Sequence, residues 1–392
     1  MTGATAARPT LSVCIPAYNR PALFATALRS VLAQAAPLGA RVEVVVSDDS
    51  TDAATGEVCD CQLRGWDGMA GYHRNVPPLG MAANWNRCVD LARGGHVLLL
   101  HDDDFLLPGA LAAVVRALDS CQPPPEVLLF GVDVVGAGGR RRRRQSVRHR
   151  HYLPPEQALV ALLADSSFVR FPGMVVSRAA YRAAPPFDEG IGEVADVLMW
   201  ARLLAVHGIR REPAVTAAYR VHAGALTTGM WRPEVVEAAA RVFDDGAVSD
   251  VLSDGERQRL KRRWTSQFVL AGAWRRLRAG DGAGALEVLK LVDGLGPREA
   301  VVPVARHAGR RVLAAVVGAG WPRASGPRGQ GMPTAAPAVL LELPAKGPGG
   351  EAGSLQDPPA AGGHQDPIPS GKGQQHAERT GEDPCDAAQP SV

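Results

Sequence analysis

The sequence of 392 residues lacks several features that would assign a protein to a class at once. Its six cysteines form no CxxC pair and no Cys/His cluster with zinc-site spacing, so a structural zinc site is not expected. The formal net charge is only +3, which gives no general argument for a nucleic acid or a membrane surface as partner. The N-terminal segment MTGATAARPT has no basic stretch before an apolar core and does not resemble a signal peptide.

Long apolar runs are missing as well. The longest late run, VLAAVVGAGW from Val312, is too short to cross a bilayer, so no transmembrane segment is predicted, although peripheral contact with a membrane stays open. The cysteines are expected to be reduced thiols, which favours a cytoplasmic protein. What the sequence does contain is 46% apolar residues, enough to bury a sizeable core.

Apolar runs of strand length alternate with segments of helical periodicity in the first part of the chain. The apolar runs end in polar residues, as buried parallel strands do where they meet loops. The expected strands are residues 11–19, 41–50, 96–100 and 126–135, and the expected helices are residues 21–34, 84–95 and 109–120. This alternation predicts a Rossmann-like, doubly wound and mostly parallel α/β sheet, with ligand groups beyond the carboxyl ends of the strands.

The composition changes along the rest of the chain. Five arginines, Arg140–Arg144, follow a glycine-rich stretch, which favours a surface loop or a solvated hairpin over an anion site. From Glu234 the sequence has helical periodicity, and after Pro322 it is rich in Gly, Pro, Gln and Ser. The predicted organisation is a flexible N-terminus at 1–10, an α/β domain at 11–230, a small helical C-terminal module at 231–322 and a disordered tail at 323–392.

Three adjacent carboxylates, Asp102, Asp103 and Asp104, follow the expected strand HVLLL. Like charges repel, and carboxylates at the end of a buried strand lose hydration, so a cation is expected beside them. Hard oxygen ligands favour Mg²⁺ or Mn²⁺ as that cation. The alternative is a carboxylate that only caps the helix expected at 109–120.

Several segments, in this order, resemble the inverting glycosyltransferases of family 2, which have the GT-A fold. LSVCIPAYNRPALFATALRSVLAQ is similar to the family's first strand, P-x-Y-N loop and helix, and VEVVVSDDSTD to its second strand, with a loop one residue shorter. NVPPLGMAANWNRCVDLARGGHVLLLHDDDFLLPGAL is similar to the D-x-D region. The resemblance runs from about Leu11 to Thr228 and implies a nucleotide-sugar donor.

On the donor side, the resemblance places the D-x-D on His101, Asp102 and Asp103, with His101 in place of the first Asp. It implies that Asp103 is the direct metal ligand and that Asp102 faces the ribose or a metal-bound water. Asp104 would cap or orient the metal site.

The nucleobase is implied to lie against Pro16, Ala17 and Tyr18, with Asp49 or, given the shorter loop, Asp48 on its imide edge. A carboxylate can accept the ring N–H of uracil or thymine, so the expected donor is a UDP- or dTDP-sugar. Tyr18 could instead be a wedge between the loop and a helix.

On the acceptor side, FPGMVVSRAAYRAAPPFDEGIGEVADVLMWARLLAVHGI and AYRVHAGALTTG resemble the family's acceptor segment and closing motif. They imply that Asp196 is the general base and, because Ala195 replaces the usual Glu, that Glu193 is the second candidate. Asp196 could instead be only a charge at a helix N-terminus. His222 is implied to reach the metal or the leaving diphosphate, and Arg220 to neutralise that diphosphate.

The expected function is metal-dependent transfer of a sugar, with inversion, from a nucleotide diphosphate sugar to an acceptor hydroxyl. The acceptor could be a glycan, a lipid-linked glycan, a protein or a small molecule, because fold alone does not specify it. No nucleic-acid partner is expected. Two alternatives stay open: a GT-A-like binding or scaffold protein that has lost turnover, and a phosphoryl-transfer enzyme.

Overall fold

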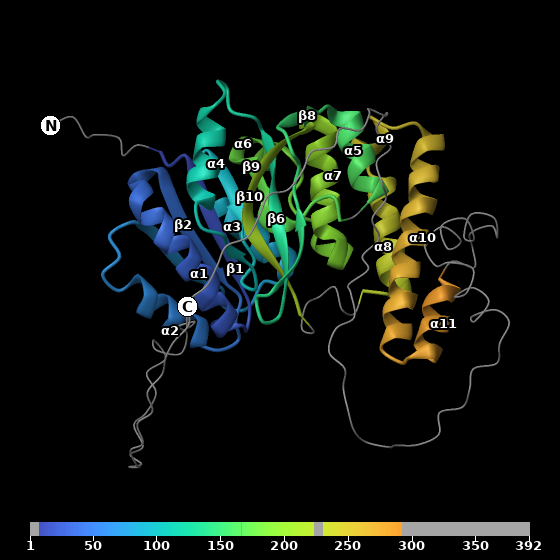
Figure 1. Ribbon diagram of the computed structural model, residues 1–392, viewed down its shortest axis with the longest axis horizontal. Coiled ribbons are helices and arrows are strands. Elements are labelled where there is room, and N and C mark those ends of the chain that lie inside the picture. Colours follow the sequence, from blue (N-terminus) through green and yellow to red (C-terminus); the bar gives the residue numbers. More distant parts are fainter. Residues whose placement is uncertain (1–7, 166, 223–229, 292–392) are drawn as a thin grey trace, which may run out of the picture. The chain divides into compact units, whose positions relative to one another are not determined.

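A ten-stranded sheet with helices on both faces forms the centre of the computed structural model, which describes residues 8–165, 167–222 and 230–291 (Figure 1). The strands are β1 (Leu11–Ala17), β2 (Val42–Asp48), β3 (Met69–Arg74), β4 (His96–Leu99), β5 (Phe105–Leu106), β6 (Val127–Gly136), β7 (Arg141–Gln145), β8 (His151–Leu153), β9 (Met174–Ser177) and β10 (Ile209–Val221). The helices are α1 (Pro21–Ala35), α2 (Ala54–Leu63), α3 (Met81–Leu91), α4 (Ala110–Asp119), α5 (Pro155–Ala164), α6 (Arg178–Ala183), α7 (Ala195–His207), α8 (Pro233–Phe243), α9 (Gly246–Ser249), α10 (Asp254–Arg278) and α11 (Gly282–Lys290). Three short 3₁₀ helices are η1 (Ala36–Arg41), η2 (Phe171–Gly173) and η3 (Glu189–Val194).

The strand order is β3-β2-β1-β4-β9-β6-β10-β5, with β7 paired to β6 and β8 paired to β10. Strands β3, β2, β1 and β4 are parallel, and β9 lies antiparallel between β4 and β6. Because β10 is parallel to β6, both run in the direction of β1. The predicted α/β class with a mostly parallel sheet is therefore confirmed. The carboxyl ends of β1, β2, β4 and β10 all point to one edge of the sheet.

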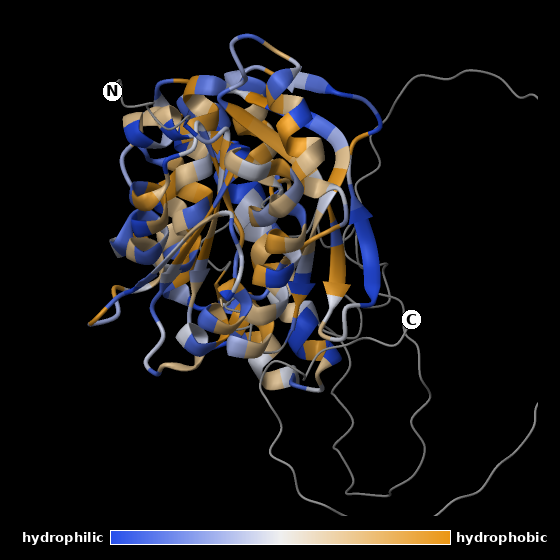
Figure 2. Ribbon diagram, turned by 90° about the vertical axis from the view of Figure 1, so that its left-hand side faces the viewer, coloured by the Kyte–Doolittle hydropathy of each residue, from blue (hydrophilic) through white to orange (hydrophobic). Residues whose placement is uncertain are grey.

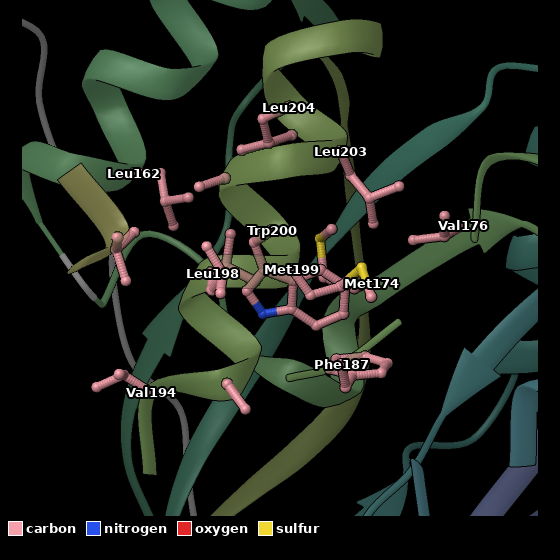
Figure 3. Packing of buried hydrophobic residues seen from close by; sticks show 14 of the residues in the cluster. Leu162, Met174, Val176, Phe187, Val194, Leu198, Met199, Trp200, Leu203 and Leu204 are labelled. Carbon is pink, nitrogen blue, oxygen red and sulfur yellow. The ribbon is translucent and has the colours of Figure 1, made fainter. Parts of the chain in front are cut away.

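Side chains alternate between two cores along the buried strands, as the two-residue period of a strand requires. In β1, Leu11, Val13 and Ile15 pack with α1 and α4, whereas Cys14 packs on the opposite face with α3. The opposite core also contains α5, α7 and parts of α8 and α10. Figure 3 shows Trp200 of α7 at its centre, in contact with residues of several elements.

The expected helix at 84–95 begins three residues earlier, at Met81, after Gly80 in the left-handed region with φ of 93°. Of the two expectations for Arg140–Arg144, the hairpin is confirmed and the irregular loop is wrong, because Arg141–Gln145 forms β7, which pairs antiparallel with β6. The turn is a hairpin, and its strand is the uniformly blue one beside orange strands in Figure 2. Backbone pairing with a buried strand outweighs the charge of the arginine side chains, most of which are exposed.

Helices α8, α10 and α11 follow the sheet in the chain, and Figure 1 shows α8 and α10 near α5 and α7, with α11 beside α10. No helix in the described part of the chain is long and apolar enough to cross a membrane.

The thiols of Cys14, Cys59, Cys88 and Cys121 are free, but Cys61 is disulfide-bonded, which corrects the expectation of reduced thiols throughout. The N-terminal residues 1–7 and the tail predicted at 323–392 lie outside the described residues.

We expect the replacement Trp264→Ala in α10 to lower the free energy of unfolding by about 3–5 kcal/mol, the usual loss for a buried large aromatic. Trp264 is 5% exposed and stacks on Phe268 at 4.9 Å between ring centroids. The matched control is Trp274→Ala on the same helix, which is 43% exposed and should change stability much less. Urea denaturation measures both, and equal losses would contradict the packing of α10 on the sheet's core.

Candidate functional site

Charged side chains from loops far apart in the sequence meet at the edge of the sheet where β1, β4 and β10 end. The loop after β4 carries Asp102, Asp103 and Asp104. The loop after β1 contributes Tyr18 and Arg20, and the end of β10 contributes Arg220 and His222. In an open α/β sheet this edge is where ligands bind.

Asp102 is buried and holds the loop after β1. Its Oδ2 accepts a hydrogen bond from the backbone N–H of Tyr18 at 2.9 Å, and its Oδ1 lies 3.2 Å from Nη1 of Arg20. Burial raises the pKa of Asp102 to about 6, while the Tyr18 N–H and Arg20 oppose the rise. A carboxylate held in this way fixes the position of Tyr18, whose ring is 53% exposed beside the same edge.

Asp103 lies between two basic side chains. Its Oδ2 accepts from Nη1 of Arg20 at 2.9 Å and lies 3.0 Å from Nε2 of His222. The contact with His222 joins the end of β10 to the aspartate loop.

Asp104 is buried, and only one of its two carboxylate oxygens has a partner. Its Oδ1 accepts the backbone N–H of Arg220 at 2.8 Å, whereas Oδ2 has no hydrogen-bond partner among the described residues. Burial, together with the charge of Asp103, raises the pKa of Asp104. The helix α4 begins after Gly109 without a side-chain cap, so the alternative that an aspartate of this cluster caps that helix is wrong.

Arg220 lies on the inner side of the same loop. Its Nε donates to the backbone carbonyl of Asp103 and its Nη1 to that of Ala137, both at 2.8 Å. The guanidinium also lies over the ring of Phe105, 5.2 Å from its centroid. These contacts position the aspartate loop, and the predicted role of Arg220 toward a diphosphate stays a prediction.

A group of potential metal ligands is present in this loop. Ligand atoms of His101, Asp103 and Asp104 all lie within 4.8 Å of one another. Nε2 of His101 and Oδ2 of Asp104 are both buried without a hydrogen-bond partner in the described part of the chain. Unpaired buried polar atoms are costly, so this donor set of one imidazole and two carboxylates fits a divalent cation.

The imidazole of His101 is set by an aromatic cluster. Its ring stacks on Trp85 at 5.4 Å and lies 4.1 Å from the ring of Phe171, between centroids. Burial lowers the pKa of His101, so its neutral form is favoured, and neutral imidazole is the form that binds a metal.

The predicted nucleobase residues lie at the ends of β1 and β2. Pro16 and Ala17 are buried in β1, and the exposure of Tyr18 shows that it is not a buried wedge. Asp48 accepts from the Ser50 N–H and the Tyr72 hydroxyl, at 2.9 and 2.7 Å.

Asp49 likewise holds a neighbouring loop. It accepts from the Asn75 side chain and from the backbone N–H groups of Leu79 and Gly80, at 2.7–2.9 Å. Both carboxylates therefore stabilise loops beside Tyr18, and their contact with a base stays a prediction.

The two candidate bases differ sharply in their surroundings. Asp196 lies in the first turn of α7, where its Oδ1 accepts the N–H of Val197 at 2.7 Å, and burial raises its pKa to about 6. The guanidinium of Arg170 partly offsets this rise. Glu193 instead forms an ion pair with Arg232. The raised pKa of Asp196 suits a general base near neutral pH.

Comparison with known proteins assigns a family to this arrangement. Residues 12–183 match the sequence model described as Glycosyl transferase family 2. This segment of the chain belongs to the family.

Curated relatives match this chain over segments of different length. Abequosyltransferase RfbV of Salmonella typhimurium is 31% identical over 110 residues, which are 28% of this chain and 33% of RfbV. The succinoglycan biosynthesis protein ExoO of Rhizobium meliloti is 26% identical over 79% of this chain and 88% of ExoO. The chain spans only about a third of the length of the first curated relatives that it matches, 33–34%.

A solved structure shares the fold. The crystal structure of S. aureus TarS 1–349 in complex with UDP-GlcNAc aligns with a TM-score of 0.51 and 16% identity, over 72% of this chain and 90% of TarS 1–349. At this identity the likeness shows a common GT-A fold and nothing further.

The family 2 segment ends before Asp196, Arg220 and His222. Contacts in the structure connect Arg220 and His222 to the aspartate loop. Two residues of the candidate site were not predicted from the sequence. Arg20, directly after the P-x-Y-N loop, contacts both Asp102 and Asp103, and its position in that loop was the available signal. His101 was seen only as a departure from the motif, although its ring nitrogen belongs to the group of potential ligands.

The raised pKa of Asp196 predicts a pH-dependent stability. Its pKa in the folded protein is about 6, against 3.8 ordinarily, so the buried charge destabilises the fold above pH 6 and the cost disappears as pH falls toward 4. Asp196→Asn keeps the oxygen that accepts the Val197 N–H and removes the charge. We expect the variant to be more stable than the parent by about 1–3 kcal/mol at pH 7.5.

Denaturation at pH 7.5 and pH 4 checks this result, and the difference should shrink at the lower pH. Glu193→Gln is the control, and it should bring no stabilisation because it breaks the ion pair with Arg232. A parent and an Asp196→Asn variant of equal stability at both pH values would contradict the buried charge.

Proposed function

We propose that this protein transfers a sugar from a nucleotide diphosphate sugar to an acceptor hydroxyl, with inversion at the anomeric carbon. The observation that carries the proposal is the meeting of Asp102, Asp103 and Asp104 with His222 at the edge where β1 and β10 end. Membership of glycosyl transferase family 2 supports the reaction class. The neighbouring TarS was crystallised with UDP-GlcNAc, which supports a UDP-sugar as donor.

The donor nucleotide would lie against the loop after β1. Asp102 holds the backbone of Tyr18, so the exposed ring keeps a fixed place beside the sheet edge and offers a surface for a base. Asp48 and Asp49 hold the adjoining loops through hydrogen bonds to neighbouring residues. The fixed loops form the base subsite, and either carboxylate would accept the ring N–H of a pyrimidine.

The donor set at the aspartate loop fits Mn²⁺ or Mg²⁺. Asp103 and Asp104 would hold the ion, with His222 or His101 as the nitrogen ligand, because each has an atom in or beside the group of potential ligands. A bound divalent cation stabilises the negative charge that develops on the leaving diphosphate. Arg20 and Arg220 add positive charge within the same loop system.

The acceptor would approach Asp196. Its raised pKa makes the carboxylate a stronger base than an exposed aspartate, and it is largely ionised at neutral pH. Asp196 would take the proton from the acceptor hydroxyl as the oxygen attacks the anomeric carbon on the face opposite the diphosphate. Glu193 is the weaker candidate because its carboxylate is engaged by Arg232.

A nucleotide-sugar-binding protein without turnover is the second candidate. The ion pairs of Arg20 with Asp102 and Asp103 favour it, because they neutralise part of the carboxylate charge without any metal. Phosphoryl transfer finds no support: the first strand ends in CIPAYN without a nucleophilic Asp, and no lysine precedes Lys261.

We expect Asp103→Ala to weaken Mn²⁺-dependent binding of UDP by at least about 10-fold. Removal of a residue that only orients a metal ligand already lowers metal affinity by about that factor, and Asp103 is the proposed ligand itself. The fold should survive, since Asp103 lies in a loop. Titration calorimetry with UDP, with and without Mn²⁺, measures the change. The control is Asp119→Ala, which removes an exposed carboxylate paired with Arg41. UDP binding to Asp103→Ala as tight as to the parent in Mn²⁺ would rule out the metal assignment.

We expect Asp196→Asn to bind UDP and Mn²⁺ normally but to lose sugar transfer by about 10²–10⁴, the usual contribution of a general base. Glu193→Gln should retain most transfer. A panel of UDP-sugars, with release of UDP as readout, measures both variants. Full transfer by Asp196→Asn would refute the base assignment, and a product that retains the anomeric configuration would refute the single displacement.

Turnover also decides between the two candidate functions. Binding of a UDP-sugar without release of UDP, in the presence of Mn²⁺ and a panel of acceptors, would favour the binding protein.

A further inference from the structure

Three half-buried arginines gather beneath the β6–β7 hairpin without an acidic partner. They are Arg143 of β7, Arg170 before η2 and Arg211 of β10. Among the described residues, no carboxylate lies within ion-pair distance of their guanidinium groups, which is 4.0 Å. Nε of Arg143 and Nε of Arg211 are buried without a hydrogen-bond partner in the same part of the chain.

Gln145 links these arginines into one cluster. Its Oε1 accepts from Nη2 of Arg143 at 3.3 Å and from Nε of Arg170 at 3.4 Å, and its Nε2 donates to the backbone carbonyl of Phe168 at 3.0 Å. The guanidinium of Arg211 lies over the ring of the same Phe168, 4.8 Å from its centroid.

A small cavity of about 10 Å³ is lined by Gln145, Phe168, Arg170 and Arg211, and also by the acidic residue Glu212. We call Arg143, Arg170 and Arg211 with Gln145 the arginine cluster.

The carboxylates nearest to the arginine cluster are engaged by other arginines. Asp133 pairs with Arg144, and Glu212 pairs with Arg150 and Arg210. Burial lowers the pKa of Arg170 and of Arg211, and for Arg170 this effect outweighs the opposing influence of Tyr219 and of the charge of Asp165. Buried charges are normally paired, so the chain leaves positive charge here for an anion from outside.

The arginine cluster lies on the acceptor side of the candidate site. Arg170 lies 5.0 Å over the ring of Tyr219, and its charge acts on Asp196, whose pKa it lowers against the effect of burial. The donor residues Tyr18 and Asp102 lie instead at the end of β1. A group bound at Arg170 would therefore be on the side of the candidate base and separate from the nucleotide.

We propose that the arginine cluster binds an oxyanion of the acceptor, a phosphate group above all, and that the acceptor is an anionic molecule. Guanidinium groups present forked donors that match the oxygens of phosphate, which suits several arginines around one anion. The exposed arginines of the hairpin, Arg140, Arg142 and Arg148, add a positive field that attracts such an acceptor. The acceptor role rests on the proposed function, whereas the anion site itself does not.

The test uses the full chain with UDP and Mn²⁺ present. The diphosphate of UDP then fills the part of the donor site that could otherwise bind free phosphate. Inorganic phosphate is titrated against the protein at constant ionic strength in chloride, and heat of binding and melting temperature are recorded. We expect phosphate to bind the parent without displacing UDP. Arg211→Gln should raise the Kd for phosphate at least about 10-fold, the loss expected when one charged hydrogen-bond donor is removed.

Arg148→Gln is the matched control, because Arg148 is an exposed arginine of the same hairpin. It should leave the Kd for phosphate within about 2-fold of the parent, as expected for a screened surface charge. Arg143→Gln is a second variant of the cluster, in case Arg211→Gln does not fold. Without phosphate, neither cluster variant should lower the melting temperature markedly, because the charge removed has no anionic partner.

Equal weakening in Arg148→Gln and in the cluster variants would overturn the site in favour of general surface attraction. Phosphate that binds only by displacing UDP would also overturn it, since the anion would then occupy the donor site. If the proposed function is wrong, the parent will not bind UDP. The Kd values for phosphate, compared between the parent and the variants, would still decide whether the anion site exists.

Discussion

The burial of three adjacent carboxylates at the end of β4 is the constraint on which the site depends. Asp102, Asp103 and Asp104 repel one another and lose hydration, so each needs a donor from another part of the chain. The backbone N–H of Tyr18 serves Asp102, that of Arg220 serves Asp104, and Arg20 contacts both Asp102 and Asp103. The carboxylates thereby tie the loop after β1 to the end of β10.

The direction of the strands makes these contacts possible. Antiparallel β9, between β4 and β6, allows β6 and β10 to run the same way as β1. The carboxyl end of β10 therefore lies at the same edge as that of β4, which brings His222 to Asp103. The aromatic cluster of Trp85, Phe171 and His101 fills the space behind the aspartate loop and fixes the imidazole.

Two opposite charge patterns lie on the same sheet. The aspartate loop concentrates negative charge and the arginine cluster concentrates positive charge. Among the described residues, Oδ2 of Asp104 and Nε of Arg211 have no hydrogen-bond partner. In our proposals the first binds a cation with the donor diphosphate and the second binds an anion of the acceptor. Arg170, a member of the second group, lowers the pKa of Asp196 against the effect of burial. Such an arrangement would hold two negatively charged substrates apart until they react.

The sequence by itself determined the sheet class, the strands at β1, β2, β4 and β6, and the donor-side motif, because these depend on local periodicity and on residue order. It also pointed to Asp103 and Asp196 through the resemblance to family 2. It could not distinguish a loop from the hairpin of β6 and β7, because a run of arginines carries no alternation that would reveal backbone pairing with buried β6. Only the tertiary structure decided which atoms lack partners and that Arg20, His101 and Arg170 join the site. Burial and pairing across distant segments set these properties, and no local pattern carries them.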